Sequence, residues 1–274
     1  MDYLIIGHIT KDHFQNGYRL GGTAVYSGVL AQRMGLNVAV FTSGASNLDL
    51  DIMKGIDIID QPSPGTTTFI NEYSPEGRTQ RLLDRAEDLD LNQIPEMWRQ
   101  AKIIHLAPLA RDVPISASRE FPQGILAYSL QGWMRDWDDE GWISSTPLPR
   151  LDPPVRKKSA GFLSIEDLGD NRNALKSIHS QFPTLVTTLG PMGVKIQSGS
   201  RILSVPAPPA AERDPTGAGD IFAAAFMILW KLWGTDIERA AFMANALAAS
   251  SVSQQGTNGI PKKELITEIL EVQK

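Results

Sequence analysis

The most informative stretch of the sequence is Asp214-Pro215-Thr216-Gly217-Ala218-Gly219-Asp220-Ile221-Phe222, and a long apolar run follows it directly. Gly217 and Gly219 lack β-carbons, so an anion can approach their backbone N–H groups closely. The first turn of the following helix adds unpaired donors and the positive end of its dipole. The stretch therefore predicts an anion-binding turn at a helix start, suited to holding a transferring phosphoryl group.

Asp220 stands one residue beyond the last glycine of that turn. At the edge of an anion hole its carboxylate would accept a hydrogen bond from an attacking hydroxyl and take its proton, as phosphoryl transfer requires. On spacing alone a second interpretation stands equally: the glycines only permit a turn, and Asp220 only favours the helix dipole. A dinucleotide-binding fingerprint fits less well, because the third glycine of G-x-G-x-x-G is missing.

Composition narrows the class of protein. The chain has 274 residues, no cysteine and a formal net charge of −5. This length suffices for one large α/β domain that buries a core without disulfides. Lack of cysteine fits a reducing compartment, and the N-terminal apolar run is too short for a signal peptide, so we expect a cytoplasmic protein. No apolar run reaches the ~20 residues of a membrane span, so we expect no membrane association. No block of basic residues is present, so we expect no nucleic-acid partner.

Short β-branched runs alternate with amphipathic or small-residue stretches along the chain. Strands are expected near 2–7, 37–42, 102–107, 124–129, 160–165 and 184–188. Helices are expected at 22–35, 90–100, 169–181, 217–233, 236–253 and 262–272. This alternation indicates an α/β fold with a mostly parallel sheet covered by helices.

The segment 66–83 has a different rhythm, with two extended runs around Pro75-Glu76-Gly77-Arg78. This pattern predicts a β-hairpin. Together with extended residues at about 13–20, the hairpin would form a small β lid over the C-terminal edge of the sheet. The alternative is an edge hairpin with no role in binding. We treat 1–274 as a single domain that includes this lid.

Residues 214–226, DPTGAGDIFAAAF, resemble the C-terminal signature of the PfkB, or ribokinase-like, carbohydrate kinase family. Pro215 stands where a threonine or serine is more usual. The resemblance implies a ribokinase-like three-layer sandwich with a mostly parallel central sheet and a small β lid. It also implies that Asp220 is the catalytic base and that the anion hole consists of Gly217, Ala218 and Gly219.

Two early stretches are similar to the acceptor-binding motifs of that family. The first is 7–12, GHITKD, which looks like a first strand ending in a glycine, followed by an aspartate that bonds acceptor hydroxyls. Without the family, that aspartate would be interpreted as a solvated loop carboxylate. The second is 21–26, GGTAVY, which is similar to the diglycine motif that closes around the acceptor. The acceptor-binding residues implied by these stretches are Asp12, Gly22, Thr23 and Tyr26.

The nucleotide side is implied by resemblance as well. Residues 188–193 resemble the family's T-x-G-x-x-G loop, and two later segments match a helix and a turn that border the adenine in relatives. The implied nucleotide-binding residues are Thr188, Gly190, Gly193, Thr216, Asn245 and Gly256. The family's N-x-x-E motif, which organises magnesium through water, corresponds here to Ser164-Ile165-Glu166-Asp167, and leaves Asp167 as the metal candidate. The expected cofactors are ATP with Mg²⁺, and a monovalent cation is a further option.

Residues 130–135, LQGWMR, look like a stretch of inositol-kinase-like members, in which Gln131 and Arg135 would donate to acceptor hydroxyls. Ser129 stands where those members usually have an aspartate. Tyr26 replaces an asparagine that contacts the sugar in ribokinase, which weakens the case for ribose. Four basic residues lie in the expected lid and substrate loops without forming a block: Lys11, Arg81, Arg111 and Arg135. An uncharged acceptor is therefore expected.

The sequence thus predicts ATP-dependent phosphoryl transfer to a hydroxyl of a small uncharged sugar or polyol, with an inositol-like acceptor as one option. One alternative is a nucleoside or vitamin kinase of the same superfamily, which an aromatic acceptor pocket would favour. Another is a catalytically weak sugar- or nucleotide-binding regulator, suggested by Ser164 and Pro215. The resemblance also allows a homodimer through the lid.

Overall fold

The structure is a computed structural model that describes residues 1–14, 17–45, 48–74, 77–169, 173–234 and 236–271, with no side chains described for 72–78. Four expectations therefore fall partly outside the described residues. They concern Pro75 and Glu76 in the expected hairpin turn, residues 15–16 of the expected lid, residues 170–172 of the expected helix at 169–181, and residue 272 of the expected helix at 262–272.

The centre of the fold is a nine-stranded sheet with the order β15-β14-β13-β12-β9-β8-β1-β4-β5. Its strands are β1 (Tyr3–Ile6), β4 (Val38–Gly44), β5 (Asp57–Pro62), β8 (Ile103–Leu106), β9 (Ile125–Ser129), β12 (Ser159–Ser164), β13 (Thr184–Thr188), β14 (Val194–Ser198) and β15 (Arg201–Val205). Neighbours from β5 to β13 run parallel, whereas β14 and β15 pair antiparallel. The segments that follow the parallel strands therefore gather at one edge of the sheet, where open α/β sheets bind ligands.

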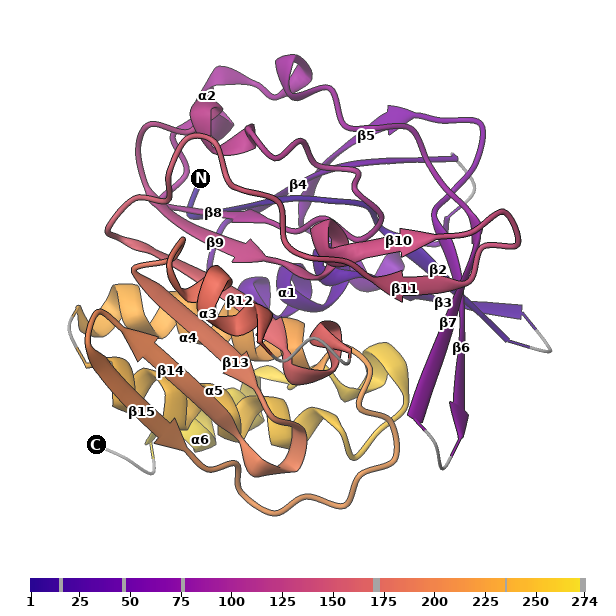
Figure 1. Cartoon of the computed structure of the whole chain (residues 1–274). Coiled ribbons are helices and arrows are strands. Elements are labelled where there is room, and N and C mark those ends of the chain that lie inside the picture. Colours follow the sequence, from indigo (N-terminus) through magenta and orange to yellow (C-terminus); the bar gives the residue numbers. More distant parts are fainter. Residues whose placement is uncertain (15–16, 46–47, 75–76, 170–172, 235, 272–274) are drawn as a thin grey trace.

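Helices cover both faces of this sheet and give the molecule three layers (Figure 1). The helices on one face are α1 (Thr23–Arg33), α4 (Ala218–Trp233), α5 (Ile237–Ser251) and α6 (Lys263–Glu271). The other face carries the short helices α2 (Glu96–Arg99) and α3 (Ala174–His179). Phe162 of β12 meets the rings of Phe222 and Phe226 edge-on, with centroids 6.4 and 5.8 Å apart. These aromatic contacts fix α4, and with it Asp220, on the sheet.

Seven 3₁₀ helices complete the helical elements of the described residues. They are η1 (Asp51–Met53), η2 (Leu91–Gln93), η3 (Ala117–Glu120), η4 (Gln131–Met134), η5 (Ile165–Leu168), η6 (Gly190–Met192) and η7 (Gly256–Gly259). Four of them, η4 to η7, begin within a few residues of segments that the sequence assigns to binding. Three of these, η4, η5 and η6, follow the ends of β9, β12 and β13, whereas η7 follows α5.

A four-stranded sheet, here called the small sheet, stands beside the large one (Figure 1). Its order is β3-β2-β6-β7, with β2 (Thr10–Phe14), β3 (Gly17–Gly21), β6 (Thr68–Ser74) and β7 (Gly77–Asp84). A hairpin of β10 (Arg135–Trp137) and β11 (Ile143–Ser145) supports it, because the Leu82 N–H donates to the Gly141 carbonyl at 2.8 Å. The small sheet is thus joined to the body on its β7 side.

The expected α/β fold, with a mostly parallel sheet and a small separate sheet, is confirmed. The six expected strands are all present, within two residues of their expected bounds. The expected helix at 90–100 is wrong in its extent: it is divided into η2 and α2 on either side of Pro95, which lacks the N–H donor that a continuous helix needs. The expected helix at 169–181 is likewise shorter within the described residues. Strands β5, β14 and β15 were not predicted. The edge strands β5 and β15 lack the continuous buried run that marks the central strands.

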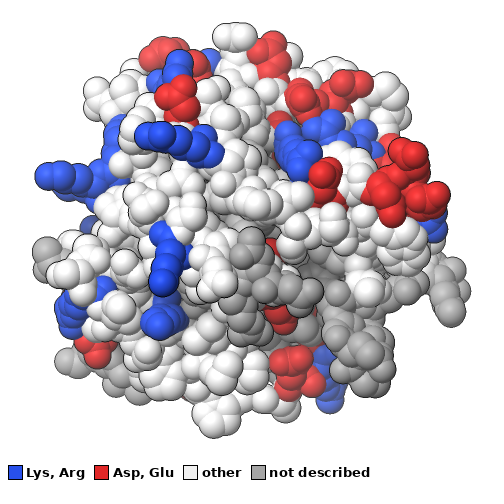
Figure 2. Space-filling model, viewed as in Figure 1, with Lys and Arg blue, Asp and Glu red and all other residues white. Residues whose placement is uncertain are grey.

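Figure 2 shows Lys and Arg scattered over the face in view, with no single basic patch. Among the helices of the described residues, none combines the length and the apolar character needed to cross a bilayer.

Candidate active site

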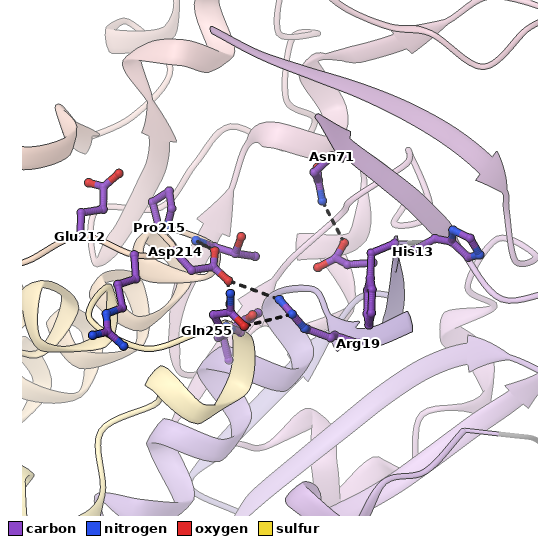
Figure 3. Close-up of a pocket in the computed structure, with 13 residues that line it drawn as sticks. His13, Arg19, Asn71, Glu212, Asp214, Pro215 and Gln255 are labelled. Atoms are coloured by element: carbon purple, nitrogen blue, oxygen red, sulfur yellow. Dashed lines mark hydrogen bonds and ion pairs between the residues drawn. The ribbon is translucent and has the colours of Figure 1, made fainter. Parts of the chain in front are cut away.

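A cavity of about 400 Å³ lies between the small sheet and the segment that precedes α4 (Figure 3). Its lining comes from parts of the chain that are far apart in sequence. The lining residues used below are Asp12, Phe14, Arg19, Tyr26, Asn71, Asp214, Thr216, Gln255 and Gly256. The cavity therefore brings together four residues predicted from the sequence, namely Asp12, Tyr26, Thr216 and Gly256.

The turn before α4 has the geometry of an anion-binding turn. Gly217 caps the 16-residue helix in the left-handed conformation, with φ 80°, and lies against the ring of Tyr26. No neighbouring atom lies within 4 Å of the position that a β-carbon on Gly219 would take, so the first turn is open on that side. The Ala218 N–H donates to the Pro215 carbonyl at 3.1 Å and holds the turn. The open side and the positive end of α4 fit a phosphate group.

Asp220 is held by α1 through two hydrogen bonds. The Thr23 hydroxyl donates to Asp220 Oδ1 at 2.6 Å, and the Ser27 hydroxyl donates to the Asp220 carbonyl at 2.9 Å. Although the residue is partly exposed, its surroundings withdraw the carboxylate from water, and this burial raises the pKa of Asp220 to about 6. The Thr23 hydrogen bond and the charge of Arg135 lower that pKa, while Asp167 and Asp12 raise it. The base candidate thus lies in the electrostatic field of three other predicted site residues.

Asp12 belongs to a chain of polar side chains that crosses the small sheet. Asn71 Nδ2 donates to Asp12 Oδ1 at 3.2 Å, and Gln80 Nε2 donates to Asn71 Oδ1 at 2.5 Å. Arg135 Nη2 donates to Gln80 Oε1 at 2.6 Å, and its Nη1 donates to the Leu109 carbonyl at 3.0 Å. The guanidinium of Arg135 is therefore turned towards the small sheet and the backbone at Leu109.

Asn71 and Gln80 were not singled out from the sequence. They face each other directly across β6 and β7, so their side chains share one face of the hairpin. The sequence does contain two amide side chains, one in each expected strand of the hairpin. To see that they pair, one needs the register of the two strands, which the sequence alone does not give.

Arg19 connects the small sheet to the loops on the far side of the cavity (Figure 3). Its Nη2 donates to Gln255 Oε1 at 3.2 Å, and its Nη1 lies 3.8 Å from Asp214 Oδ2. Asp214 in turn accepts from the backbone N–H groups of Gly256 at 2.8 Å and Thr216 at 3.0 Å. Because these loops flank the anion-binding turn, Arg19 links the small sheet to that turn.

Gln131 and Asp167 contact each other. Gln131 Nε2 donates to Asp167 Oδ1 at 3.0 Å, and the Ser164 N–H donates to Asp167 Oδ2 at 2.7 Å. Each carboxylate oxygen keeps a lone pair that could accept from a metal-bound water. In the parts of the chain that the structure describes, no three His, Asp or Glu side chains gather as a metal cluster. The residues present thus fit Mg²⁺ that is carried by a nucleotide and reached through water.

Four residues assigned to the nucleotide from the sequence are not among those that line the cavity. Thr188 ends β13, and Gly190 and Gly193 have φ values of 58° and 89° in the turn that follows. A β-carbon on Gly193 would lie 2.2 Å from the Val205 carbonyl oxygen, so close packing is enough to require a glycine at this position. Asn245 is buried and donates to the carbonyls of Val205 and Pro206 at 2.9 and 3.2 Å. The Asn245 amide therefore fixes the backbone after β15, and its role towards a nucleotide stays a prediction.

A buried pair that sequence reasoning passed over supports the start of the small sheet. His8 Nδ1 lies 2.7 Å from the Thr67 hydroxyl, and Asp112 Oδ2 accepts from the His8 N–H at 3.0 Å. Asp112 Oδ1 also accepts from the N–H groups of Leu109 and Ala110. Burial opposes ionisation of Asp112, yet His8 and the backbone donors lower its pKa overall. The pair fixes the connection between β1 and Asp12.

Known proteins resemble parts of this chain in sequence. Residues 158–263 match the model of the pfkB family carbohydrate kinase. The ribokinase of Bacillus subtilis (strain 168) is 39% identical over 87 residues, which make up 31% of this chain and 29% of that protein. The match therefore spans less than a third of the length of that relative.

Two further proteins resemble most of the chain. The cytidine kinase of Thermococcus kodakarensis is 24% identical over 250 residues, covering 83% of this chain and 87% of that protein. A solved structure of a pyrophosphate-dependent kinase in the ribokinase family, complexed with a pyrophosphate analog and myo-inositol, is 20% identical. It superposes with a TM-score of 0.79 over 98% of this chain and 99% of that chain, which shows a shared fold.

Proposed function

We propose that this chain is a carbohydrate kinase of the pfkB type, and that it transfers a phosphoryl group from ATP to a hydroxyl of a small uncharged sugar or polyol. One observation carries the proposal. A partly exposed carboxylate, Asp220, stands in the first turn of α4, beside the open side of Gly219 and within the electrostatic field of Asp12. A base and an anion-binding turn therefore adjoin in one site.

Asp220 acts as the general base in this proposal. Thr23 occupies Oδ1, which leaves Oδ2 to accept a hydrogen bond from the acceptor hydroxyl. As the hydroxyl oxygen bonds to phosphorus, the bond between phosphorus and the bridging oxygen of the donor breaks, and the hydroxyl proton passes to Asp220. A pKa of about 6 keeps the carboxylate ionised at neutral pH and near the value that serves a general base.

The turn at 217–219 has the complementary task. The positive end of α4 stabilises negative charge on the transferring group, and the missing β-carbon of Gly219 leaves room for it. Asp167 would reach the Mg²⁺ of the ATP complex through water, and this ion would neutralise phosphate charge. The predicted monovalent cation has no residues assigned to it.

The charges around Asp220 favour an uncharged acceptor. Asp12 and Asp167 add negative charge near the base, and the positive charge of Arg135 partly offsets it. The two nitrogens Nη1 and Nη2 of Arg135 already donate to Leu109 and Gln80, so its charge is partly committed to the protein. A phosphorylated sugar would meet repulsion from the carboxylates, whereas hydroxyl groups can donate to them. An inositol-like polyol is one acceptor of this class.

A nucleoside acceptor is the second candidate. Phe14 and Tyr26 contribute aromatic rings to the cavity, and the cytidine kinase of Thermococcus kodakarensis aligns over most of the chain. Aromatic rings can stack on the planar face of a base. An acceptor with a planar base would then be preferred over myo-inositol.

The test is product formation, followed by ³¹P NMR, with Mg²⁺-ATP and Mg²⁺-pyrophosphate as donors. Pyrophosphate is included because it is the donor of the structurally similar kinase. Acceptors are pentoses, hexoses, inositols and cytidine. We expect a phosphate monoester from ATP and an uncharged sugar or polyol. Saturable donor binding without any product would favour a binding regulator instead. Dimerisation through the small sheet stays a prediction, to be measured by light scattering.

A further inference from the structure

We propose that Thr23 is a positioning residue, which orients the carboxylate of Asp220 and holds it in the ionised form. The proposal rests on the proposed function of Asp220 as the base. It assigns Thr23 a different task from acceptor binding, which the resemblance implies for this residue.

The geometry begins with a pair of hydrogen bonds from one helix. Thr23 is 2% exposed, and its hydroxyl donates to Asp220 Oδ1 at 2.6 Å. An O–H group at this distance from a carboxylate forms a strong, charge-assisted hydrogen bond. Ser27, one turn later on α1, donates to the Asp220 carbonyl at 2.9 Å. Helix α1 therefore holds both the side chain and the main chain of Asp220.

The position of the Thr23 hydroxyl is fixed before any acceptor binds. A β-branched side chain in a helix has few rotamers. The preceding residue, Gly22, has φ 88°, and a β-carbon there would lie 2.8 Å from the His8 carbonyl oxygen and from a Leu109 methyl group. This close packing fixes where α1 begins. The hydroxyl has one hydrogen to donate, and it is given to Asp220, so Thr23 has none left for an acceptor.

The charges around Asp220 explain why the carboxylate needs this donor. Burial, Asp167 and Asp12 all favour its protonated form, and Thr23 and Arg135 favour its ionised form. These groups come from β2, η5, β10 and α1, and the phenols of Tyr3 and Tyr26 also face Asp220. Removing the Thr23 hydroxyl would leave the opposing carboxylates in place. Asp220 would then hold its proton to higher pH.

The test is a ¹³C NMR titration of the Asp220 carboxyl, assigned by its absence in Asp220→Asn. The variants are Thr23→Val, which keeps the shape, and Thr23→Ser, which keeps the hydroxyl. Ser27→Ala is the matched control, because it removes a hydroxyl that bonds the backbone of the same residue. We expect the pKa of Asp220 to rise by about one unit in Thr23→Val. It should stay near the wild-type value in Thr23→Ser and in Ser27→Ala.

A kinetic measurement separates positioning from acceptor binding. We expect Thr23→Val to lower kcat roughly tenfold, with a smaller change in the KM for the acceptor. An unchanged pKa of Asp220, or a raised KM with kcat retained, would overturn the proposal. If Thr23→Val does not fold by circular dichroism, Thr23→Ala replaces it. The titration needs no turnover. If the protein phosphorylates no acceptor, the kinase function is refuted, and the pKa of Asp220 in Thr23→Val still tests the role of Thr23.

Discussion

The ring of Tyr26 lies so close to Gly217 that a β-carbon built on the glycine would be 2.2 Å from the ring atom Cδ1. This contact joins helix α1 to the turn that begins α4. Tyr26 also lines the cavity, where the sequence places it against the acceptor. The same side chain therefore adjoins the acceptor side and the anion-binding turn, and the two glycines of that turn should respond differently to substitution.

Gly217→Ala should destabilise the fold, and Gly219→Ala should not. At Gly217 the new methyl group meets the Tyr26 ring, and the left-handed backbone alone costs about 1–2 kcal/mol for alanine. At Gly219 the space is open, and alanine in a helix is favoured by up to about 1 kcal/mol. The methyl group added by Gly219→Ala would nevertheless occupy the side where the phosphoryl group is proposed to bind. Urea unfolding and kcat/KM of both variants test the contrast.

Gly217→Ala and Gly219→Ala serve as controls for each other, because both add one methyl group to the same turn. Equal losses of stability would contradict the packing described for Gly217. Full activity in Gly219→Ala would contradict the proposed place of the phosphoryl group.

Activity should fall on the acid side with an apparent pKa near 6. Burial raises the pKa of Asp220 to about 6, and a base must be ionised to take a proton. Below that pH, kcat/KM should decrease about tenfold per unit, while activity above it should reach a plateau on this limb. The measurement is kcat/KM for the acceptor between pH 4.5 and 8 at constant ionic strength. A kcat/KM that stays on its plateau down to pH 4.5, as a carboxylate with the ordinary aspartate pKa of 3.8 would give, would exclude Asp220, as described, from this role.

The polar chain across the small sheet should govern acceptor affinity. Asn71→Ala removes the amide that donates to Asp12 and the oxygen that accepts from Gln80. We expect the KM for the acceptor to rise roughly tenfold, with the KM for the donor little changed, because Asp12 loses its orientation. Gln93→Ala is the control, since this exposed amide bonds Asp90 away from the cavity. A rise in the donor KM alone would contradict this prediction, because it would mean that these polar side chains act on the phosphoryl donor and not on the acceptor.

The fold could be predicted largely because its central strands are apolar and its long helices are regular. The buried patterns of β1, β8 and β9 and the small-residue pattern of α1 gave elements close to their observed bounds. Strands β5 and β15 at the edges of the large sheet escaped prediction because they lack the continuous buried run of the central strands. The interruption at Pro95 shows that helical composition does not override a missing N–H donor.

The candidate site was predicted in two ways. Asp12, Tyr26, Thr216 and Gly256, which line the cavity, came from the family resemblance. The Gly217–Gly219 turn and Asp220 follow from the physical needs of an anion and a base. Arg19, Asn71 and Gln80 depend on strand register and on loops that meet from distant parts of the chain, which no local pattern encodes. The hydrogen bond from Thr23 to Asp220 joins residues 197 positions apart in sequence, so the sequence alone could not assign it.

The most direct measurement is turnover of Asp220→Asn beside the wild type, with an acceptor that the product screen identifies. The account predicts a loss of kcat of about 10²–10⁴-fold with a folded protein. The amide should also stabilise the fold near neutral pH, because a pKa raised above 3.8 means that folding disfavours the ionised carboxylate there. A folded variant that keeps kcat within about tenfold of the wild type would contradict the central claim that Asp220 is the base.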